Sequence, residues 1–439
     1  MNPKKTDCYK RFNTCRFIVT IMIGILLMIS ANIFAETTRP QIIITPGEAL
    51  MDQKVNIKLV NFIPDQIVTL HTRLSYQGNQ WTSHATYQVN KQGAINLDSD
   101  RALSGSYTGV EPMGLFWSLA PVEEKLGERA ANIFQVTATI NNHLMAAGEF
   151  LPLTVKPGVV KEIVRSNGLV GTFYYPKESG PYPGVIILDG PEGGLNETQA
   201  ATLAAHGYAA LALAYSGIEK LPRQINKIPL EYFESAILWL QSREMVAKEK
   251  IGVMGTSKGS EIGLLVASYF PTIKAVVAYS PSSVVWQSPD TSDKNSASSW
   301  TYRGKQIPYV PFQNSIFGKL WAKTPYKDSL KNQEAIKKAT IPVEKINGPV
   351  LLISGREDTV WPSTQMAKSI IKQRKKNKRP YPDKHLSYPG AGHLFKLFYL
   401  PSSTFSKPKS TFGGTLKSNY QAGWNSWDQA VRFLDKALK

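Results

Sequence analysis

The chain has 439 residues, which is long enough for two domains with sizeable cores. Its apolar share of 42% and charged share of 19% are those of a globular protein and exclude a disordered chain. The net charge of +18 would suit an anionic partner, but no zinc-finger spacing or other nucleic-acid motif accompanies it. We therefore interpret the charge as a basic soluble surface and expect no nucleic-acid partner.

Residues 1–35 carry a targeting signal. Five basic side chains precede the uncharged apolar run 17–34, and Ala35 is followed by a polar stretch. This pattern predicts either a secretory signal peptide cleaved after Ala35 or an uncleaved membrane anchor through residues 17–35. Both stay open, because Ile33 fits the −3 position of a cleavage site poorly and the run nearly spans a bilayer. In either case we expect the body to lie outside the cytosol, as a periplasmic, secreted or membrane-anchored protein.

The chain's two cysteines, Cys8 and Cys15, both precede the apolar run. The body therefore has no thiol for a disulfide, a thiolate metal site or a cysteine nucleophile. His71, His84 and His143 are scattered over strand-like segments and have no neighbours at metal-ligand spacing, so we interpret them as structural or surface residues. We expect neither a metal nor a cofactor.

Residues 40–157 have the pattern of a β domain. Short segments rich in Val, Ile, Thr and aromatic residues are separated by Gly- and Pro-containing turns, which is typical of an antiparallel, immunoglobulin-like β-sandwich. The predicted strands are 41–45, 55–60, 67–76, 85–89 and 134–140. The run 105–119, GSYTGVEPMGLFWSL, predicts a loop packed against a large apolar surface, such as the second domain. Residues 152–158 are the predicted linker.

Residues 159–439 alternate between apolar strand-like runs and helical patterns. This alternation predicts an α/β domain, in which a parallel sheet carries helices on both faces. The predicted strands are 184–188, 209–214, 251–254, 275–279 and 350–354. The predicted helices are 199–206, 229–241, 261–269 and 364–375.

The segment 250–270 contains the strongest chemical signal. Its residues Gly255-Thr256-Ser257-Lys258-Gly259 fit G-x-S-x-G, between an apolar strand and a helix. In that setting the serine occupies a sharp strand-to-helix turn, and the glycines allow the close approach that the turn requires. We predict that Ser257 is a nucleophile. A plain tight turn is the alternative, and a Walker-type phosphate loop is not supported.

An acid and a histidine follow the serine in the chain order of an α/β-hydrolase. Asp358 lies in the loop after the strand 350–354, where a carboxylate can fix an imidazole in the required tautomer. Glu357 is its local competitor, and a solvated loop acid is the alternative role.

The preferred histidine is His393, in the Gly-rich loop 388–395. His385 is the alternative, although it follows a basic stretch and is expected to be exposed. His206 is expected to end a helix, where a cation suits the helix dipole.

Acyl transfer also needs hydrogen-bond donors for a developing oxyanion. The backbone N–H of Lys258, which follows the predicted nucleophile, is one candidate. The loop 189–195 is expected to supply the second; because Pro191 has no N–H, the donor there must be Glu192, Gly193 or Gly194. An ordinary Gly-rich strand–helix connection is the alternative for this loop.

Two further segments interrupt the alternating pattern. Residues 283–345 contain a polar Ser-rich part (287–304) and an aromatic part (309–321), and they resemble an insertion that could act as a lid. The tract 368–384 is rich in Lys and Arg, and we interpret it as a solvated helix end rather than a binding patch.

Together these motifs resemble the acyl-CoA thioesterase / bile acid-CoA:amino acid N-acyltransferase family, with its dienelactone-hydrolase-like catalytic domain. The run 105–119 is close to the family's G-S-[FY]-x-G-[LV]-E-P-M-G-L-x-W pattern. The other matching segments are 189–195, 205–215, 231–234, 255–261, 390–393 and 413–415. The resemblance covers nearly everything after the signal segment, and it implies a sandwich domain followed by an α/β-hydrolase domain.

The resemblance also implies a nucleophile, acid and histidine at Ser257, Asp358 and His393. Family members that conjugate acyl groups to amino acids typically use cysteine as nucleophile and the hydrolases use serine, so Ser257 favours hydrolysis of an acyl thioester. Export of the body would separate it from CoA, which leaves another thioester or an oxygen ester as substrate. A carboxylesterase or acyltransferase acting on envelope lipids is the alternative, and a non-catalytic binding or adhesion protein is a third hypothesis.

Overall fold

The protein is described from a computed structural model, which describes residues 39–76, 79–125, 133–290, 296–312, 325–395, 399 and 412–439. The described residues form two compact units. The first contains those of Met1–Gly47, Val55–Leu115 and Glu124–Phe150, and the second contains those of Glu48–Lys54, Phe116–Glu123 and Leu151–Lys439. Two short segments that precede residue 150 in the chain are thus part of the second unit.

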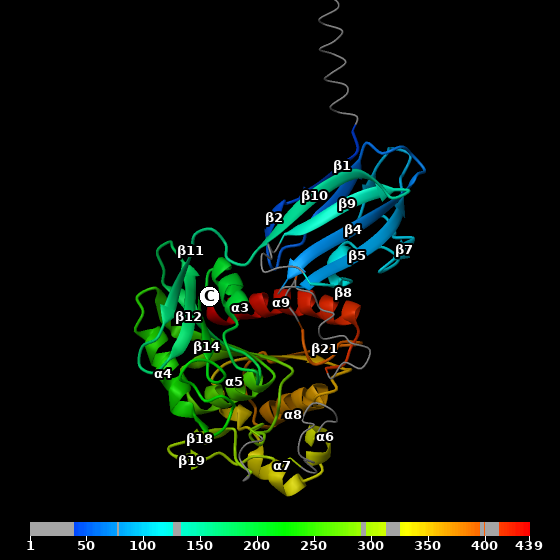
Figure 1. Ribbon diagram of the computed structural model, residues 1–439. Helices are drawn as coiled ribbons and strands as arrows, with labels where there is room; N and C mark the ends of the chain where they lie inside the picture. Colours follow the sequence, from blue (N-terminus) through cyan, green and yellow to red (C-terminus); the bar gives the residue numbers. More distant parts are fainter. Residues whose placement is uncertain are drawn as a thin grey trace, which may run out of the picture. The chain divides into compact units, whose positions relative to one another are not determined.

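The first unit is a β structure with two sheets (Figure 1). One sheet has the order β1 (Gln41–Thr45), β3 (Asn56–Val60), β6 (Ile95–Asn96), and the other has the order β10 (His143–Leu153), β9 (Phe134–Ile140), β4 (Ile67–Tyr76), β5 (Asn79–Gln88), β7 (Ser104–Gly105). Neighbouring strands in both are antiparallel. The sheets contact each other at Gly148, where a Cβ atom would lie 3.2 Å from Cγ2 of Ile42. The immunoglobulin-like connectivity stays a prediction.

Side-chain alternation explains which of these strands the sequence predicts. In β4, Val68, Leu70, Thr72 and Leu74 are buried and the residues that alternate with them are partly or fully exposed, as a half-buried strand requires. In contrast, β5 begins six residues before the predicted start at 85; the sequence did not reveal this part because one of its buried positions, Ser83, is polar. The strand β10 was not predicted, since its first residues, including Leu144, are exposed.

The segment 105–119 is more structured than the predicted loop. It contains the end of β7 and the short helix α2 (Gly114–Trp117), and it is followed by β8 (Ala120–Lys125). Its residues from Phe116 onward belong to the second unit. Within that unit, β2 (Glu48–Leu50) also pairs in parallel with the last three residues of β10.

The second unit is built on an eight-stranded sheet. The strand order is β11 (Val159–Val164), β12 (Val170–Pro176), β14 (Ala209–Ala214), β13 (Tyr182–Leu188), β16 (Val246–Thr256), β17 (Ile273–Tyr279), β20 (Val350–Gly355), β21 (Lys384–Tyr388). All neighbours are parallel except that β12 runs against both β11 and β14. The five predicted strands, β13, β14, β16, β17 and β20, pair in parallel as expected. The reversed strand β12 was not among the predicted strands; a short turn at 165–169 joins it to β11, and so short a connection permits only antiparallel pairing.

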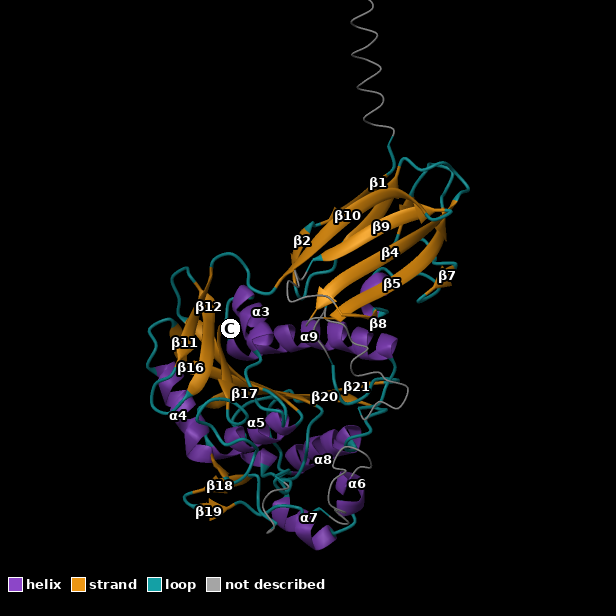
Figure 2. Cartoon of the chain, in the orientation of Figure 1, coloured by secondary structure: helices purple, strands orange, loops and turns teal. Residues whose placement is uncertain are grey.

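Helices cover both faces of this sheet, as the alternation of the sequence predicts. The helices α3 (Glu197–Ala205) and α9 (Leu416–Leu438) lie on one face, and α4 (Leu230–Gln241), α5 (Lys258–Tyr269) and α8 (Ser363–Lys376) lie on the other (Figures 1 and 2). The central strands are buried on both faces. The strand order, the single reversed strand and the helix positions define an α/β-hydrolase fold, which confirms the predicted fold class.

The described residues of the insertion 283–345 form several short helices and strands. It contains β18 (Trp300–Tyr302) and β19 (Lys305–Gln306), which form a small sheet with β15 (Ile228–Pro229), and also α6 (Pro325–Ser329), α7 (Gln333–Ala339) and a 3-10 turn (Val343–Lys345). Its apolar residues Val284, Trp286 and Val310 are buried in one cluster with Trp361. The predicted aromatic segment lies partly outside the described residues, and the lid role stays a prediction.

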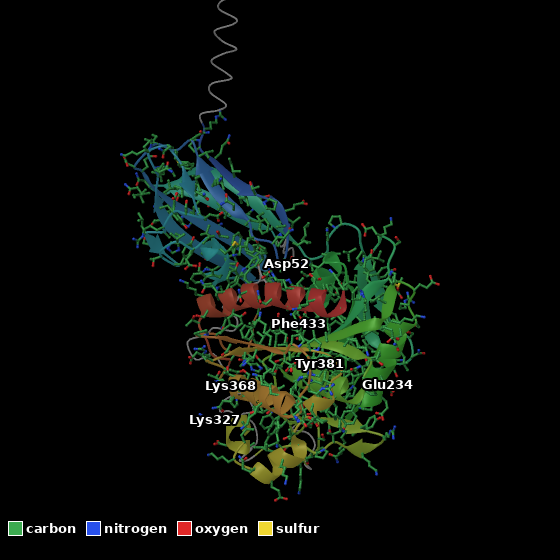
Figure 3. All side chains as sticks on the ribbon, turned by 180° about the vertical axis from the view of Figure 1, so that it is seen from behind. Asp52, Glu234, Lys327, Lys368, Tyr381 and Phe433 are labelled. Atoms are coloured by element: carbon green, nitrogen blue, oxygen red, sulfur yellow. The ribbon has the colours of Figure 1, made fainter. Side chains whose placement is uncertain are left out.

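The basic tract 368–384 departs from the predicted solvated helix end in one residue. Lys368 on α8 is exposed (Figure 3), as are most cations of the tract. Arg374, however, is completely buried, and its guanidinium binds Asp383 with Nε–Oδ2 2.7 Å and Nη2–Oδ1 3.0 Å. The guanidinium also donates to the carbonyls of Val343 and Gly348. Arg374 therefore joins α8 to the segment before β20, through these carbonyls, and to the segment before β21, through Asp383.

Across the described ranges, we find no helix that combines the length and the apolar character required to cross a bilayer. The predicted signal peptide or anchor, residues 1–35, lies outside those ranges together with Cys8 and Cys15. Export of the body therefore stays a prediction from the sequence.

The helix α5 approaches the end of β13 so closely that only glycine fits at position 259. A Cβ atom there would lie 2.3 Å from the carbonyl oxygen of Leu188, whereas a Cβ at Gly263, one turn later, would lie 3.4 Å from Cγ2 of Val253. We therefore expect Gly259→Ala to lower the free energy of unfolding by about 1–3 kcal/mol, as overpacking does. The matched control Gly263→Ala should leave it unchanged or raise it, and urea unfolding measures both. Equal effects would contradict this packing.

Candidate active site

Ser257 stands at a strained turn between β16 and α5. Its backbone has φ 56° and ψ −120°, a conformation that non-glycine residues rarely adopt and that costs about 1–3 kcal/mol. The turn is tight because a Cβ atom at Gly255 would lie 2.1 Å from the carbonyl oxygen of Gly259. The Ser257 amide donates to the carbonyl of Tyr279 at the end of β17, with N–O 3.0 Å. The turn thus has the geometry of a nucleophile elbow.

The imidazole of His393 meets this serine from a loop 136 residues further along the chain. Its Nε2 lies 2.8 Å from Oγ of Ser257, and the histidine is 1% exposed. Trp361 contacts the ring edge-on, with centroids 5.1 Å apart, and Phe412 stacks on it at 6.4 Å. The backbone of His393 is fixed as well: its N–H donates to the carbonyl of Phe412, and its carbonyl accepts from the hydroxyl of Ser280.

Asp358 holds the other side of this imidazole. Its Oδ2 lies 2.8 Å from Nδ1 of His393, and its Oδ1 accepts the backbone N–H groups of Val360 and Trp361 at 2.9 and 3.2 Å. Both carboxylate oxygens are therefore occupied, and the aspartate cannot turn without losing three hydrogen bonds. Because Nδ1–H donates to this carboxylate, Nε2 is left as the acceptor that faces the serine hydroxyl.

The alternatives for these two positions do not reach the serine. Glu357 is exposed, and its backbone N–H donates to the carbonyl of Ala391. The sequence predicted an exposed His385, but this residue is half-buried in β21. Its Nε2 lies 2.8 Å from Oγ of Ser354. Burial lowers the pKa of His385. His206 is the C-cap residue of α3, as predicted.

The loop that carries His393 is fastened to the start of α9. A Cβ atom at Gly392 would lie 2.1 Å from the carbonyl oxygen of Gly413, so the two backbones touch. Asn419 on α9 accepts the N–H of Gly392 at 2.7 Å and donates to the carbonyl of Gly413 at 3.3 Å. These contacts explain why 390–393 and 413–415 appear as separate motifs in the sequence and act together in the structure.

The loop after β13, which was predicted to supply an oxyanion donor, packs against the end of β14. The amide of Gly193 donates to the carbonyl of Gly190 at 3.3 Å, and the amide of Gly194 donates to the carbonyl of Ser216 at 3.2 Å. Glu192, the third candidate, is exposed. The other predicted donor is the backbone N–H of Lys258. Lys258 is the first residue of α5, and an N–H at that position has no acceptor within its helix.

Sequence reasoning missed the role of the Lys258 side chain. Its Nζ lies 2.7 Å from both carboxylate oxygens of Glu261, and both residues are almost completely buried. Glu261 also accepts the indole N–H of Trp300 at 2.7 Å and the backbone N–H of Trp286 at 3.2 Å. Burial lowers the pKa of Lys258 and raises the pKa of Glu261, and each charge opposes the shift of the other. The i,i+3 spacing was visible in the sequence, but the burial was not.

The fold defines the class of protein: the second unit is an α/β-hydrolase domain, and a hydrogen-bonded serine, histidine and aspartate lie at the carboxyl edge of its sheet. Family comparison agrees. Residues 228–439 match the family model described as BAAT / acyl-CoA thioester hydrolase C terminal, and residues 52–149 match the one described as acyl-CoA thioester hydrolase/BAAT N-terminal region.

The chain belongs to this family of acyl-CoA thioester hydrolases and bile acid-CoA:amino acid N-acyltransferases. It is 33% identical over 419 residues to the bile acid-CoA:amino acid N-acyltransferase of Mus musculus. The aligned region covers 90% of this chain and 96% of that relative. It is 31% identical over 409 residues to acyl-coenzyme A thioesterase 1 of the same species, covering 89% and 95%. A solved structure described as a putative dienelactone hydrolase from Klebsiella pneumoniae aligns with 63% of this chain and 98% of its own, at 15% identity and a TM-score of 0.39.

The buried Lys258–Glu261 pair makes a stability prediction. Removing one partner leaves the other charge buried and unpaired, so we expect Lys258→Met and Glu261→Gln each to lower the free energy of unfolding by about 3–5 kcal/mol. The double variant should lose less than the sum, which urea unfolding of all three measures. The exposed pair Glu334–Lys338 is the control: Lys338→Met should change little. Additive losses would show that the two buried charges are independent.

Proposed function

We propose that this chain is a serine hydrolase that cleaves acyl thioesters. The observation that carries the proposal is the hydrogen-bonded series Ser257–His393–Asp358, in which both contacts of the imidazole are 2.8 Å long. Membership of a family that includes acyl-CoA thioester hydrolases supports the reaction class. The triad roles of the three residues are part of the proposal.

The first half of the proposed reaction forms an acyl-enzyme. His393 Nε2 takes the hydroxyl proton while Oγ of Ser257 attacks the acyl carbonyl carbon. Asp358 holds the imidazole in its tautomer and stabilises the imidazolium that forms. When the tetrahedral intermediate collapses, the carbon–sulfur bond breaks and the imidazolium returns the proton to the departing sulfur. The acyl group is then an ester of Ser257.

The second half returns the enzyme to its starting state. A water molecule gives a proton to His393 and attacks the ester carbonyl, and the carbon–oxygen bond to Ser257 then breaks. The imidazolium reprotonates Oγ, and the carboxylic acid leaves. In both halves we assign the backbone N–H of Lys258 as one donor to the oxyanion. The second donor is assigned to the loop of Glu192, Gly193 and Gly194, where either glycine amide would have to exchange its present acceptor.

Serine at position 257 and the leaving group together favour hydrolysis of a thioester. A thiol with a pKa of about 8.5 leaves far more readily than an amine, so thioester cleavage demands less of the site than proteolysis. In the family that this chain resembles, serine accompanies hydrolysis and cysteine accompanies transfer to amino acids. The similarity to an N-acyltransferase nevertheless makes transfer to an amine the second candidate.

Export, if the N-terminal prediction holds, bears on the leaving group. A body outside the cytosol would not meet CoA, and its substrate would then be another thioester or an oxygen ester, such as an envelope lipid. We include the location in the proposal on the basis of the N-terminal basic and apolar residues alone.

The roles within the triad are tested by matched pairs of variants. We expect Ser257→Ala to abolish labelling by a fluorophosphonate, and Asp358→Asn to lower kcat by about 10³–10⁴-fold through the wrong imidazole tautomer. The neighbouring variant Glu357→Gln should retain activity. His393→Ala should inactivate the enzyme and His385→Ala should not. Labelling that persists in Ser257→Ala would refute the nucleophile and favour the binding-protein hypothesis.

The substrate class is tested by a panel on residues 36–439. We expect kcat/KM for an acyl thioester to exceed that for the oxygen ester with the same acyl group, because thiolate is the better leaving group. Adding glycine or taurine to the assay should not divert the acyl group into an amide. A preference for the oxygen ester would support the carboxylesterase alternative, and amide formation would support acyl transfer.

A further inference from the structure

A buried series of contacts joins the helix of the proposed nucleophile to the loop of the proposed oxyanion donors. It begins at Glu261 on the first turn of α5, whose Oε1 accepts the indole N–H of Trp300. The Trp300 ring packs against that of Tyr215, with centroids 5.8 Å apart. Neither ring has more than 1% of its surface exposed.

The hydroxyl of Tyr215 ends this series at the loop. Tyr215 directly follows β14, and its hydroxyl donates to the carbonyl of Asp189 at 2.5 Å and lies 3.4 Å from that of Gly190. These two residues follow β13 and begin the loop that contains Glu192, Gly193 and Gly194. Burial raises the pKa of Tyr215 far above its ordinary value, and the nearby carboxylates of Asp189 and Glu261 add to this rise. The hydroxyl is therefore protonated at neutral pH, where it donates to the carbonyl of Asp189.

The carbonyl of Asp189 is held from two sides. A Cβ atom at Gly259, two residues after Ser257, would lie 2.4 Å from this oxygen. The backbone of the first turn of α5 is therefore packed directly against the Asp189 carbonyl. The tyrosine hydroxyl binds the same oxygen. The position of this one peptide group thus depends on the nucleophile's helix and on Tyr215 together.

We propose that Tyr215 is a positioning residue for the oxyanion hole: by holding the carbonyls of Asp189 and Gly190, it fixes the loop amides relative to Ser257. Misplacing a group by about 1 Å can cost about 10²-fold in rate, which gives such a contact a measurable kinetic effect. Tyr215 does not touch the substrate, and Trp300 and Glu261 act behind it by holding its ring. The inference rests on the proposed function, since it needs an oxyanion to form at Ser257.

The test is Tyr215→Phe, which removes the hydroxyl and keeps the ring. Its control is Tyr232→Phe, because the hydroxyl of Tyr232 also donates to a buried backbone carbonyl, that of Ala214, at 2.6 Å, and accepts the N–H of Val170 at 3.2 Å, neither of which lies in the loop. Tyr232 also packs against Phe233, a neighbour of Tyr215. Thermal unfolding of both variants measures the structural cost that the two substitutions share.

Kinetics then separate positioning from stability. For Tyr215→Phe we expect kcat for a thioester to fall about tenfold or more, less than the 10²–10³-fold that loss of an oxyanion donor costs, with KM nearly unchanged. The inhibition constant of a trifluoromethyl ketone, which forms a tetrahedral adduct with the serine, should rise by the same factor. Tyr232→Phe should leave all three constants near those of the wild type.

The outcomes distinguish the inference from the function it rests on. If the wild type itself is not labelled by a fluorophosphonate, the proposed function fails and this inference fails with it. If the wild type is labelled and Tyr215→Phe matches Tyr232→Phe in kcat and in the inhibition constant, the inference alone is overturned. Should Tyr215→Phe not fold, Trp300→Phe is measured instead, because it removes the N–H that Glu261 accepts and shrinks the ring that packs on Tyr215. An unchanged kcat and inhibition constant in that variant would overturn the inference.

Discussion

The structure of the catalytic domain depends on one unfavourable backbone conformation. Ser257 is held at φ 56° between β16 and α5, and the turn closes only because positions 255 and 259 lack a Cβ atom. Such a conformation persists when surrounding contacts determine it more strongly than local preference opposes it. Here the contacts are the buried strand before the turn, the buried helix after it, and the hydrogen bond from the Ser257 amide to Tyr279.

Around this turn the sheet gathers residues that are distant in the sequence. Parallel strands bring their carboxyl ends to one edge, and the loops after β13, β16, β20 and β21 carry Asp189, Ser257, Asp358 and His393 respectively. Each loop is then fixed by its own backbone contacts: Asp358 by two amides, and the histidine loop by Asn419 on α9. The proposed chemistry therefore relies on a rigid frame, with little motion required of the three side chains.

The buried Lys258–Glu261 pair links the first turn of α5 to the inserted segment. Removing two charges from water costs about as much as their attraction returns, so such a pair adds little to net stability. The pair does, however, make three specific hydrogen bonds. The carboxylate of Glu261 accepts the indole N–H of Trp300 and the backbone N–H of Trp286, and the ammonium of Lys258 donates to the hydroxyl of Ser299. The inserted segment is thereby tied to the first turn of α5, the helix that follows Ser257.

The sequence by itself determined the α/β class and the identities of Ser257, Asp358 and His393 as candidates, because apolar periodicity and local glycine patterns depend on neighbouring residues. It did not show that the segments 48–54 and 116–123 belong to the second unit. It could not show that β12 runs in reverse, that β10 and α9 exist, or that Arg374 and Lys258 are buried. It also could not choose between His393 and His385, or between Asp358 and Glu357, by distance. Those facts depend on how the strands and helices pack together, because His393 meets Ser257 from 136 positions away and Asp358 from 35. Only the folded sheet decides which side chains meet at its edge.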